Sequence, residues 1–120
     1  MLYIAGQVSM LDGKRLTGRC PDEVSVEEAQ VAARQCGISL LAQMEAAAGL
    51  ANVERVAQLF GLVLSTPEFG DHPKVINAAS DLLIDVLGEA GRHSRAAVGA
   101  NSLPFSCTVE IAAVVVVRTS

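Results

Sequence analysis

The chain has 120 residues, which is the length of one domain and leaves no room for a second. Hydrophobic residues make up 51% of it and aromatic residues only 3%, which is the composition of an aliphatic globular domain and excludes a disordered chain. The 9 basic and 13 acidic residues give a net charge of −4. This acidic balance, with so few rings for base stacking, argues against nucleic acid as a partner.

Membrane, export and metal signals are missing from the sequence. The longest apolar run, residues 111–117, is too short to span a bilayer, and the start MLYIAGQ lacks the basic and apolar regions of a signal peptide. We therefore expect a cytoplasmic protein with no membrane partner. Cys20, Cys36 and Cys107 are odd in number and widely spaced, with no C-x-x-C pair. They predict reduced structural cysteines, with neither a disulfide framework nor a metal site.

The first half of the chain carries strand, turn and helix signals in that order. Residues 2–6 (LYIAG) predict a buried strand, and Asp12-Gly13 predicts a tight turn that folds the next segment back as a hairpin arm. Ser25 and Glu28 have the spacing of a capping box, in which each side chain satisfies a free backbone N–H group. We expect a long amphipathic helix to begin there.

Four further segments follow in the second half. They are a covered strand at 53–65, a helix capped by Asp71 or His72 with Pro73 in its first turn, and strands at 94–100 and 107–117. The order β-β-α-β-α-β-β predicts a two-layer α+β domain, in which two helices pack on one face of a single mixed sheet. We expect another copy of the chain to cover the other, aliphatic face. The alternative for residues 107–117 is a central strand within one subunit.

Arg95 and Glu110 are ionisable residues in otherwise apolar strands. If those strands pair as antiparallel neighbours across residues 101–106, Ala97 faces Glu110 and Arg95 faces Ala112. Arg95 and Glu110 then lie on one sheet face, with their Cα atoms roughly 7 to 8 Å apart. A guanidinium binds a carboxylate through two hydrogen bonds, and a glutamate holds or activates water. The pair predicts a site for a small anionic ligand; the structural alternative is a partly buried salt bridge.

Four strings extend this pattern: LYIAGQVS, VINAASDLL, RAAVGANSLP and CTVEIAAV. In this order and spacing they resemble the Rid family of reactive intermediate deaminases, also known as YjgF or L-PSP proteins. The resemblance covers nearly the whole chain and is to a divergent subgroup rather than to archetypal RidA enzymes. It implies a homotrimer of chorismate-mutase-like subunits with ligand clefts between them. It also implies hydrolysis of enamines and 2-imino acids to 2-oxo acids and ammonia, with no metal or organic cofactor.

The resemblance assigns a role to six residues. Arg95 matches the arginine that holds the substrate carboxylate, and Glu110 matches the carboxylate that positions water. Ala97 matches a position whose backbone N–H assists binding. Ala5 and Gly6 match the strand-end backbone beside the ligand, and Asn77 matches a polar residue of the second helix near the cleft. The expected reaction is therefore deamination of a small substrate that carries a carboxylate. Two alternatives remain open: a non-catalytic protein that binds a small carboxylate or 2-oxo acid, and a ribonuclease or translation inhibitor.

Three departures from the family pattern affect the expected pocket. The single domain, residues 1–120, begins too late to contain the family's further N-terminal strand with its aromatic residue, and Tyr3 is not the equivalent of that residue. His93 stands where the pattern has proline before the arginine, and Gly99 stands where it often has glutamate. We expect these changes to alter the shape and specificity of the pocket.

Overall fold

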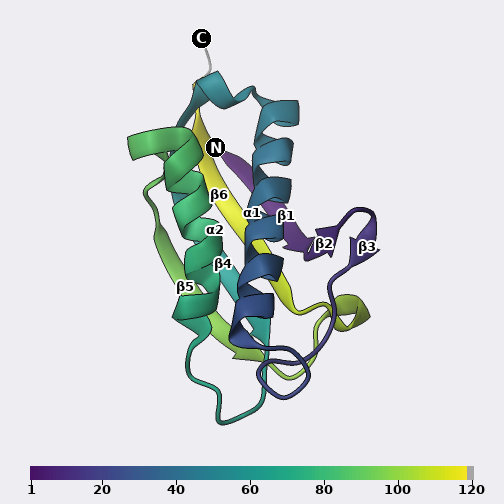
Figure 1. The fold of residues 1–120 in the computed structure, drawn as a ribbon. Coiled ribbons are helices and arrows are strands. Elements are labelled where there is room, and N and C mark those ends of the chain that lie inside the picture. Colours follow the sequence, from purple (N-terminus) through teal and green to yellow (C-terminus); the bar gives the residue numbers. More distant parts are fainter. Residues whose placement is uncertain (119–120) are drawn as a thin grey trace.

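Two helices cover one face of a four-stranded mixed sheet, as the order of elements predicts (Figure 1). The computed structural model describes residues 1–118. The sheet contains β1 (Leu2–Val8), β4 (Val53–Leu64), β5 (Ser94–Ala100) and β6 (Val109–Val117), and the helices are α1 (Val26–Ala47) and α2 (His72–Leu87). The hairpin arm contains β2 (Met10–Leu11) and β3 (Lys14–Arg15), and short 3₁₀ helices occupy Leu50–Asn52, Gly88–Gly91 and Pro104–Ser106.

The strand order β1-β6-β4-β5 makes β6 an interior strand and β5 an edge strand. The prediction that the last two strands are antiparallel neighbours is wrong, because β4 lies between them. β5 pairs in parallel with β4, and β6 pairs antiparallel with the other side of β4. A helix between two strands favours this parallel pairing. The connection after β5 then passes around the end of β4, where Leu64 N donates to Thr108 O and Ser65 N to Ala100 O.

The capping box predicted at the start of α1 is present. Glu28 N donates to Ser25 Oγ at 3.0 Å, and Ser25 N donates to Glu28 Oε1 at 2.9 Å. The hydrogen bonds from Ser25, the one from its backbone N–H first, hold the pKa of the Glu28 carboxyl below its ordinary value. Both groups therefore satisfy donors that the first turn of a helix leaves free.

Replacing Ser25 with alanine is expected to lower the free energy of unfolding by about 1 kcal/mol, because an N-cap hydrogen bond is lost. Urea denaturation measures this difference, with Ser102→Ala in an exposed connection as the control. Since the pKa of Glu28 is lowered in the folded protein, its contribution is present above the unfolded value near 4.5 and is lost as the pH falls further. Because the Ser25→Ala variant keeps the backbone N–H that bonds the Glu28 carboxylate, both proteins should lose this contribution in acid, and the difference between their free energies of unfolding should change little. A difference that disappears in acid would contradict this account.

The Asp12-Gly13 turn connects the two strands of the arm, as predicted. Both residues adopt positive φ, 53° for Asp12 and 78° for Gly13, which suits the tight hairpin turn between them. Met10 pairs with Arg15 and Leu11 with Lys14, in a small ladder separate from the main sheet. The arm therefore projects from the end of β1 and leaves the main sheet with four strands.

All three cysteines are buried and free, in agreement with the spacing argument. Burial raises the pKa of the Cys36 and Cys107 thiols, so both remain protonated at neutral pH. A protonated, buried thiol is a poor nucleophile and a poor metal ligand. These cysteines therefore belong to the core.

The face of the sheet opposite the helices is apolar and uncovered within one copy. Large apolar side chains on this face are exposed: Tyr3 on β1 is 73% exposed, Phe60 on β4 is 44% exposed and Val98 on β5 is 41% exposed. Exposed apolar groups on one continuous surface mark an interaction site more often than scattered ones do. The element count had predicted this open face.

Candidate functional site

Arg95 lies on the helix-covered face of the sheet, at the edge formed by β5. It pairs in the sheet with Leu59, which is fully buried under the helices. Its guanidinium reaches α2, where Nη1 donates to Ser80 Oγ at 3.0 Å and Nη2 donates to the Pro73 carbonyl at 3.3 Å. Among residues 1–118 it forms no salt bridge. A guanidinium has five N–H donors, so this cation retains donors for an external anion.

Ala97 and Asn77 lie on the same side of the molecule as Arg95. Ala97 follows Arg95 by two positions on β5, so both side chains point to the helix layer. The carbonyl of Pro73 points along α2 toward Asn77, because helical carbonyls face the residue four positions later. The guanidinium bound to that carbonyl is therefore level with Asn77, whose side chain is exposed. These three residues form the arginine half of the candidate site.

Glu110 lies on the opposite, open face of the sheet. Its neighbours in sequence, Val109 and Ile111, are fully buried against the helices, so its own side chain points the other way. The pairing of β1 with β6 is irregular between Ile4 and Gln7. This irregularity is a bulge that contains Ala5 and Gly6, and bulges redirect local backbone and side chains.

Gly6 brings β1 close to the Glu110 carboxylate. A Cβ atom at Gly6 would collide with Oε2 of Glu110, so the carboxylate lies directly over this glycine. Ala5, the other residue of the bulge, is exposed on the same side. Together these residues form the glutamate half of the candidate site.

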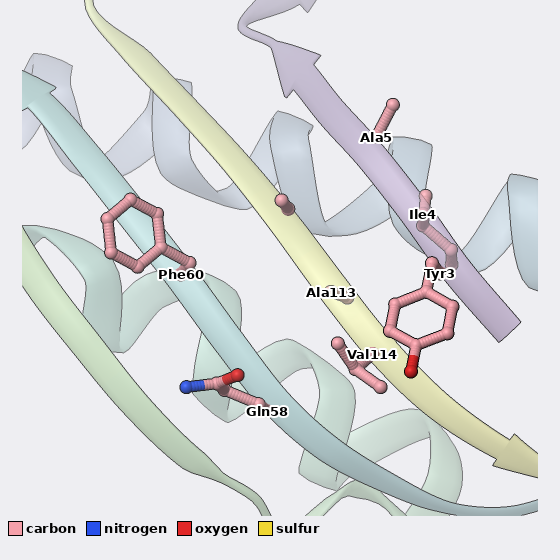
Figure 2. Close-up of a pocket in the computed structure, with 8 residues that line it drawn as sticks. Tyr3, Ile4, Ala5, Gln58, Phe60, Ala113 and Val114 are labelled. Carbon is pink, nitrogen blue, oxygen red and sulfur yellow. The ribbon is translucent and has the colours of Figure 1, made fainter. Parts of the chain in front are cut away.

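An open groove of about 340 Å³ runs along the sheet face next to the glutamate half. Figure 2 shows Phe60 and Gln58 of β4 and Tyr3 of β1 flanking Val114 of β6. The lining residues are Tyr3, Ile4, Ala5, Gln58, Phe60, Ala112, Ala113 and Val114. The groove is mostly apolar, and its polar side-chain groups are the Gln58 amide and the Tyr3 hydroxyl.

The structure separates Arg95 from Glu110, which the sequence argument had placed side by side. Arg95 is level with Leu59 on one face, whereas Glu110 is level with Leu62 on the other. The predicted pairing of Ala97 with Glu110 is wrong for the same reason, since Ala97 pairs with Gly61 of β4. The alternative of an Arg95–Glu110 salt bridge within one copy is excluded too, because the ion pairs of residues 1–118 are Arg19–Asp22 and Arg92–Glu89.

Ser80 contacts Arg95 and was not singled out in the sequence. His93, which the sequence analysis noted in place of a proline, contacts Ser80. Ser80 Oγ lies 2.8 Å from Nε2 of His93, and Nδ1 of His93 lies 2.6 Å from the Gly91 carbonyl oxygen. Ser80 is only 7% exposed. It stands in the sequence four positions after the apolar Ile76 and three before Leu83, which places it on the buried side of the helix. A buried hydroxyl needs a hydrogen-bond partner, and that signal could have revealed it.

A second, polar pocket of about 180 Å³ lies where β4 and β5 end and α2 begins. Ser65 Oγ and His72 Nε2 are 3.2 Å apart there. Gly99 is necessary for this contact, because a Cβ atom would approach both of these atoms within 2.7 Å. Asp71 occupies the N-cap position of α2 without a side-chain hydrogen bond, so the predicted side-chain cap at Asp71 or His72 is absent.

Within residues 1–118, no three or more His, Cys, Asp or Glu side chains are grouped so as to hold a metal ion. Neither helix of this part of the chain is long and apolar enough to cross a membrane. The two halves of the candidate site contain the Arg95 guanidinium, the Asn77 amide, the Glu110 carboxylate and backbone groups.

Two helices packed on one face of a mixed four-stranded sheet form the fold of chorismate-mutase-like proteins. A family model described as "YjgF/chorismate mutase-like, putative endoribonuclease" matches residues 1–115. The chain therefore belongs to the YjgF family, in which the Rid proteins are found, as the sequence resemblance predicted.

Three relatives illustrate the match. Protein TCP17 of Trypanosoma cruzi is 44% identical over 117 residues, which cover 95% of this chain and 73% of that protein. The structure of a protein of unknown function from Agrobacterium tumefaciens is 48% identical, with a TM-score of 0.94 and coverage of 97% of this chain and 77% of that one. A structure from Shewanella oneidensis, which carries the same endoribonuclease description, is 30% identical, with a TM-score of 0.89 and coverage of 94% and 76%.

Proposed function

We propose that this protein is a deaminase that hydrolyses 2-imino acids to 2-oxo acids and ammonia, and that it acts as a homotrimer. The observation that carries the proposal is the division of the site. A guanidinium without a carboxylate partner stands at the β5 edge, and a carboxylate stands over the β1 bulge on the opposite face. Each half lacks what the other supplies. An active site then requires the arginine half of one copy and the glutamate half of the next.

The open sheet face supports this assembly. Its exposed apolar side chains, Tyr3, Phe60 and Val98, need cover, and a second copy packed there would cover them. Glu110 lies on this same face, so a neighbouring copy would approach it directly. The neighbouring copy carries the Arg95 guanidinium, which has no carboxylate partner, at its β5 edge. The family resemblance implies three such clefts in a closed ring.

The proposed reaction needs orientation, water and proton transfer. Arg95 binds the substrate carboxylate through two N–H donors, which fixes the C=N carbon against Glu110. Glu110 accepts a proton from water as the water oxygen forms a bond to that carbon, whose protonated C=N group takes up the electron pair. Glu110 then returns the proton to the departing amine. As the tetrahedral adduct collapses, Glu110 accepts the proton of its hydroxyl group, the C–N bond breaks, and ammonia and the 2-oxo acid are released.

Arg95→Ala is expected to lower kcat/KM by about 100-fold or more, because two charge-assisted hydrogen bonds to the carboxylate are lost. The assay follows 2-oxo acid release from freshly generated 2-iminobutanoate. Arg34→Ala, which removes an exposed arginine from α1, is the matched control and should behave like the unmodified protein. Equal turnover in all three proteins would reject the proposed deaminase site.

A binding protein for small carboxylates is the second candidate, and the isolated arginine half favours it. That half contains an anion-binding cation in one copy without any reactive carboxylate beside it. Saturable, Arg95-dependent binding of a 2-oxo acid with no acceleration of imine hydrolysis would select this candidate. RNA cleavage that persists in Arg95→Ala would instead support the endoribonuclease description carried by the Shewanella relative.

A further inference from the structure

We infer that Ser80 and His93 are positioning residues that hold the Arg95 guanidinium ready for a substrate carboxylate; this inference rests on the proposed function. Three contacts connect them in one line. Arg95 Nη1 is 3.0 Å from Ser80 Oγ, Ser80 Oγ is 2.8 Å from His93 Nε2, and His93 Nδ1 is 2.6 Å from the Gly91 carbonyl oxygen. This series of contacts begins at the Arg95 guanidinium and ends at the backbone carbonyl of Gly91.

With the ring of His93 neutral, the chemistry of these groups fixes the direction of each hydrogen bond. The Gly91 carbonyl can only accept, so Nδ1 of His93 carries a proton. In the neutral ring Nε2 is then an acceptor, and the Ser80 hydroxyl donates its proton to it. Ser80 has no second proton, so a lone pair of its oxygen accepts from Arg95. The tautomer of His93 thus determines which side of the Ser80 oxygen faces the guanidinium.

His93 changes what a serine in a helix would otherwise do. A helical serine commonly donates its hydroxyl proton to the carbonyl four residues earlier, which here is that of Ile76. In this chain the proton goes to the imidazole on the loop before β5 instead. Ser80 is nearly fully buried, so solvent does not compete for the hydroxyl. The hydroxyl is therefore a fixed acceptor for Arg95.

Anchoring matters because arginine has a long side chain with many rotamers. Ser80 on one nitrogen and the Pro73 carbonyl on another restrict the guanidinium before any ligand arrives. Two of its five N–H donors are used in this way, and the others remain for an anion. Order that is present before binding does not have to be created during binding. Ser80 and His93 should therefore affect the affinity for the carboxylate more than the chemical step.

The kinetic test uses Ser80→Ala, His93→Phe and the double variant. Each single variant is expected to raise KM, and the Kd for 2-oxobutanoate, by about three- to tenfold with kcat changed less than about twofold. The double variant should bind no more weakly than Ser80→Ala, since His93 acts through Ser80. Ser39→Ala on α1 is the matched control. His93→Gln, whose amide offers an acceptor near the position of Nε2, should recover part of the lost affinity.

A spectroscopic test is independent of turnover. The sequence contains two histidines, so long-range ¹H–¹⁵N spectra of the intact protein and of His93→Phe assign the ring of His93 without ambiguity. We expect the neutral ring of His93 to carry its proton on Nδ1. A proton on Nε2 alone would remove the hydrogen bond to the Gly91 carbonyl, would make Nε2 the donor to Ser80 Oγ, and would overturn the inference.

The outcomes separate this inference from the proposed function. If 2-oxobutanoate binding depends on Arg95 but is unchanged in Ser80→Ala and His93→Phe, the positioning role is overturned and the proposed function stands. If neither binding nor turnover depends on Arg95, both are overturned. A KM that rises and a kcat that falls by the same factor, with a lowered unfolding temperature and no recovery in His93→Gln, would show a merely structural role. This result would also overturn the inference.

Discussion

Equal amounts of Arg95→Ala and Glu110→Gln subunits, unfolded and refolded together, are expected to regain turnover that neither variant shows alone. The reason is that the two side chains lie on opposite faces of the sheet, so the proposed cleft takes them from different copies. In a random mixture about a quarter of the clefts combine an intact arginine half with an intact glutamate half. The measurement is 2-oxo acid release per subunit before and after mixing.

The size of the effect follows from the losses in the parent variants. Glu110→Gln keeps the shape of the side chain but removes the base, which should lower kcat by about 100-fold or more. Recovery to about a quarter of the unmodified rate would therefore stand far above either background. Each variant refolded by itself is the control. A mixture that stays inactive, while its subunits are shown to exchange, would mean that the site does not bring together two copies.

Phe60→Asp is expected to convert the assembly to monomers. Phe60 stands in the middle of the open sheet face on β4, where a neighbouring copy would bury it. A carboxylate forced into an apolar interface without a partner costs several kcal/mol, which is enough to dissociate an assembly of moderate affinity. Sedimentation velocity measures the change in mass, and imine hydrolysis should be lost in parallel.

Val31→Asp is the control for this substitution. Val31 is 49% exposed on α1, so the new charge there lies on the solvent side of the helix layer. We expect it to leave both mass and turnover unchanged. If Phe60→Asp kept the mass of the unmodified protein, the open sheet face would not be the interface. A monomer that retained full activity would contradict the divided site.

Local features of this fold were predictable from the sequence because they depend on a few neighbouring residues. The capping box at Ser25 and Glu28 and the Asp12-Gly13 turn each satisfy backbone groups within a few positions, so their spacing alone identifies them. The open sheet face was predictable because two helices cover only one of the two faces of a sheet. Membership in the family followed from strings spread along the chain.

The pairing of the strands was not predictable in the same way. Neighbouring segments in sequence often pair, and that rule placed Arg95 beside Glu110. Here α2 makes β5 parallel to β4, and the last strand inserts between β1 and β4 instead. Nothing in the alternation of side chains distinguishes these two orders, because an interior strand looks the same whichever neighbours it has. Both strands were predicted at the right residues, but they were paired directly with each other instead of on either side of β4. Arg95 and Glu110 were therefore expected on the same face of the sheet.

β1 and β6 are partners although they stand first and last among the strands: Leu2 pairs with Val115, and Val8 with Glu110. During synthesis β1 has no partner until β6 has left the ribosome. The segment from α1 to β5 is contiguous in the chain, and its contacts between α1 and α2 and between β4 and β5 do not involve β6. Local contacts form before contacts between distant segments. We therefore expect a nascent chain to order Arg95 first. The bulge at Ala5 and Gly6 meets Glu110 in the last step of folding, so a stalled chain would hold an anion site without its base.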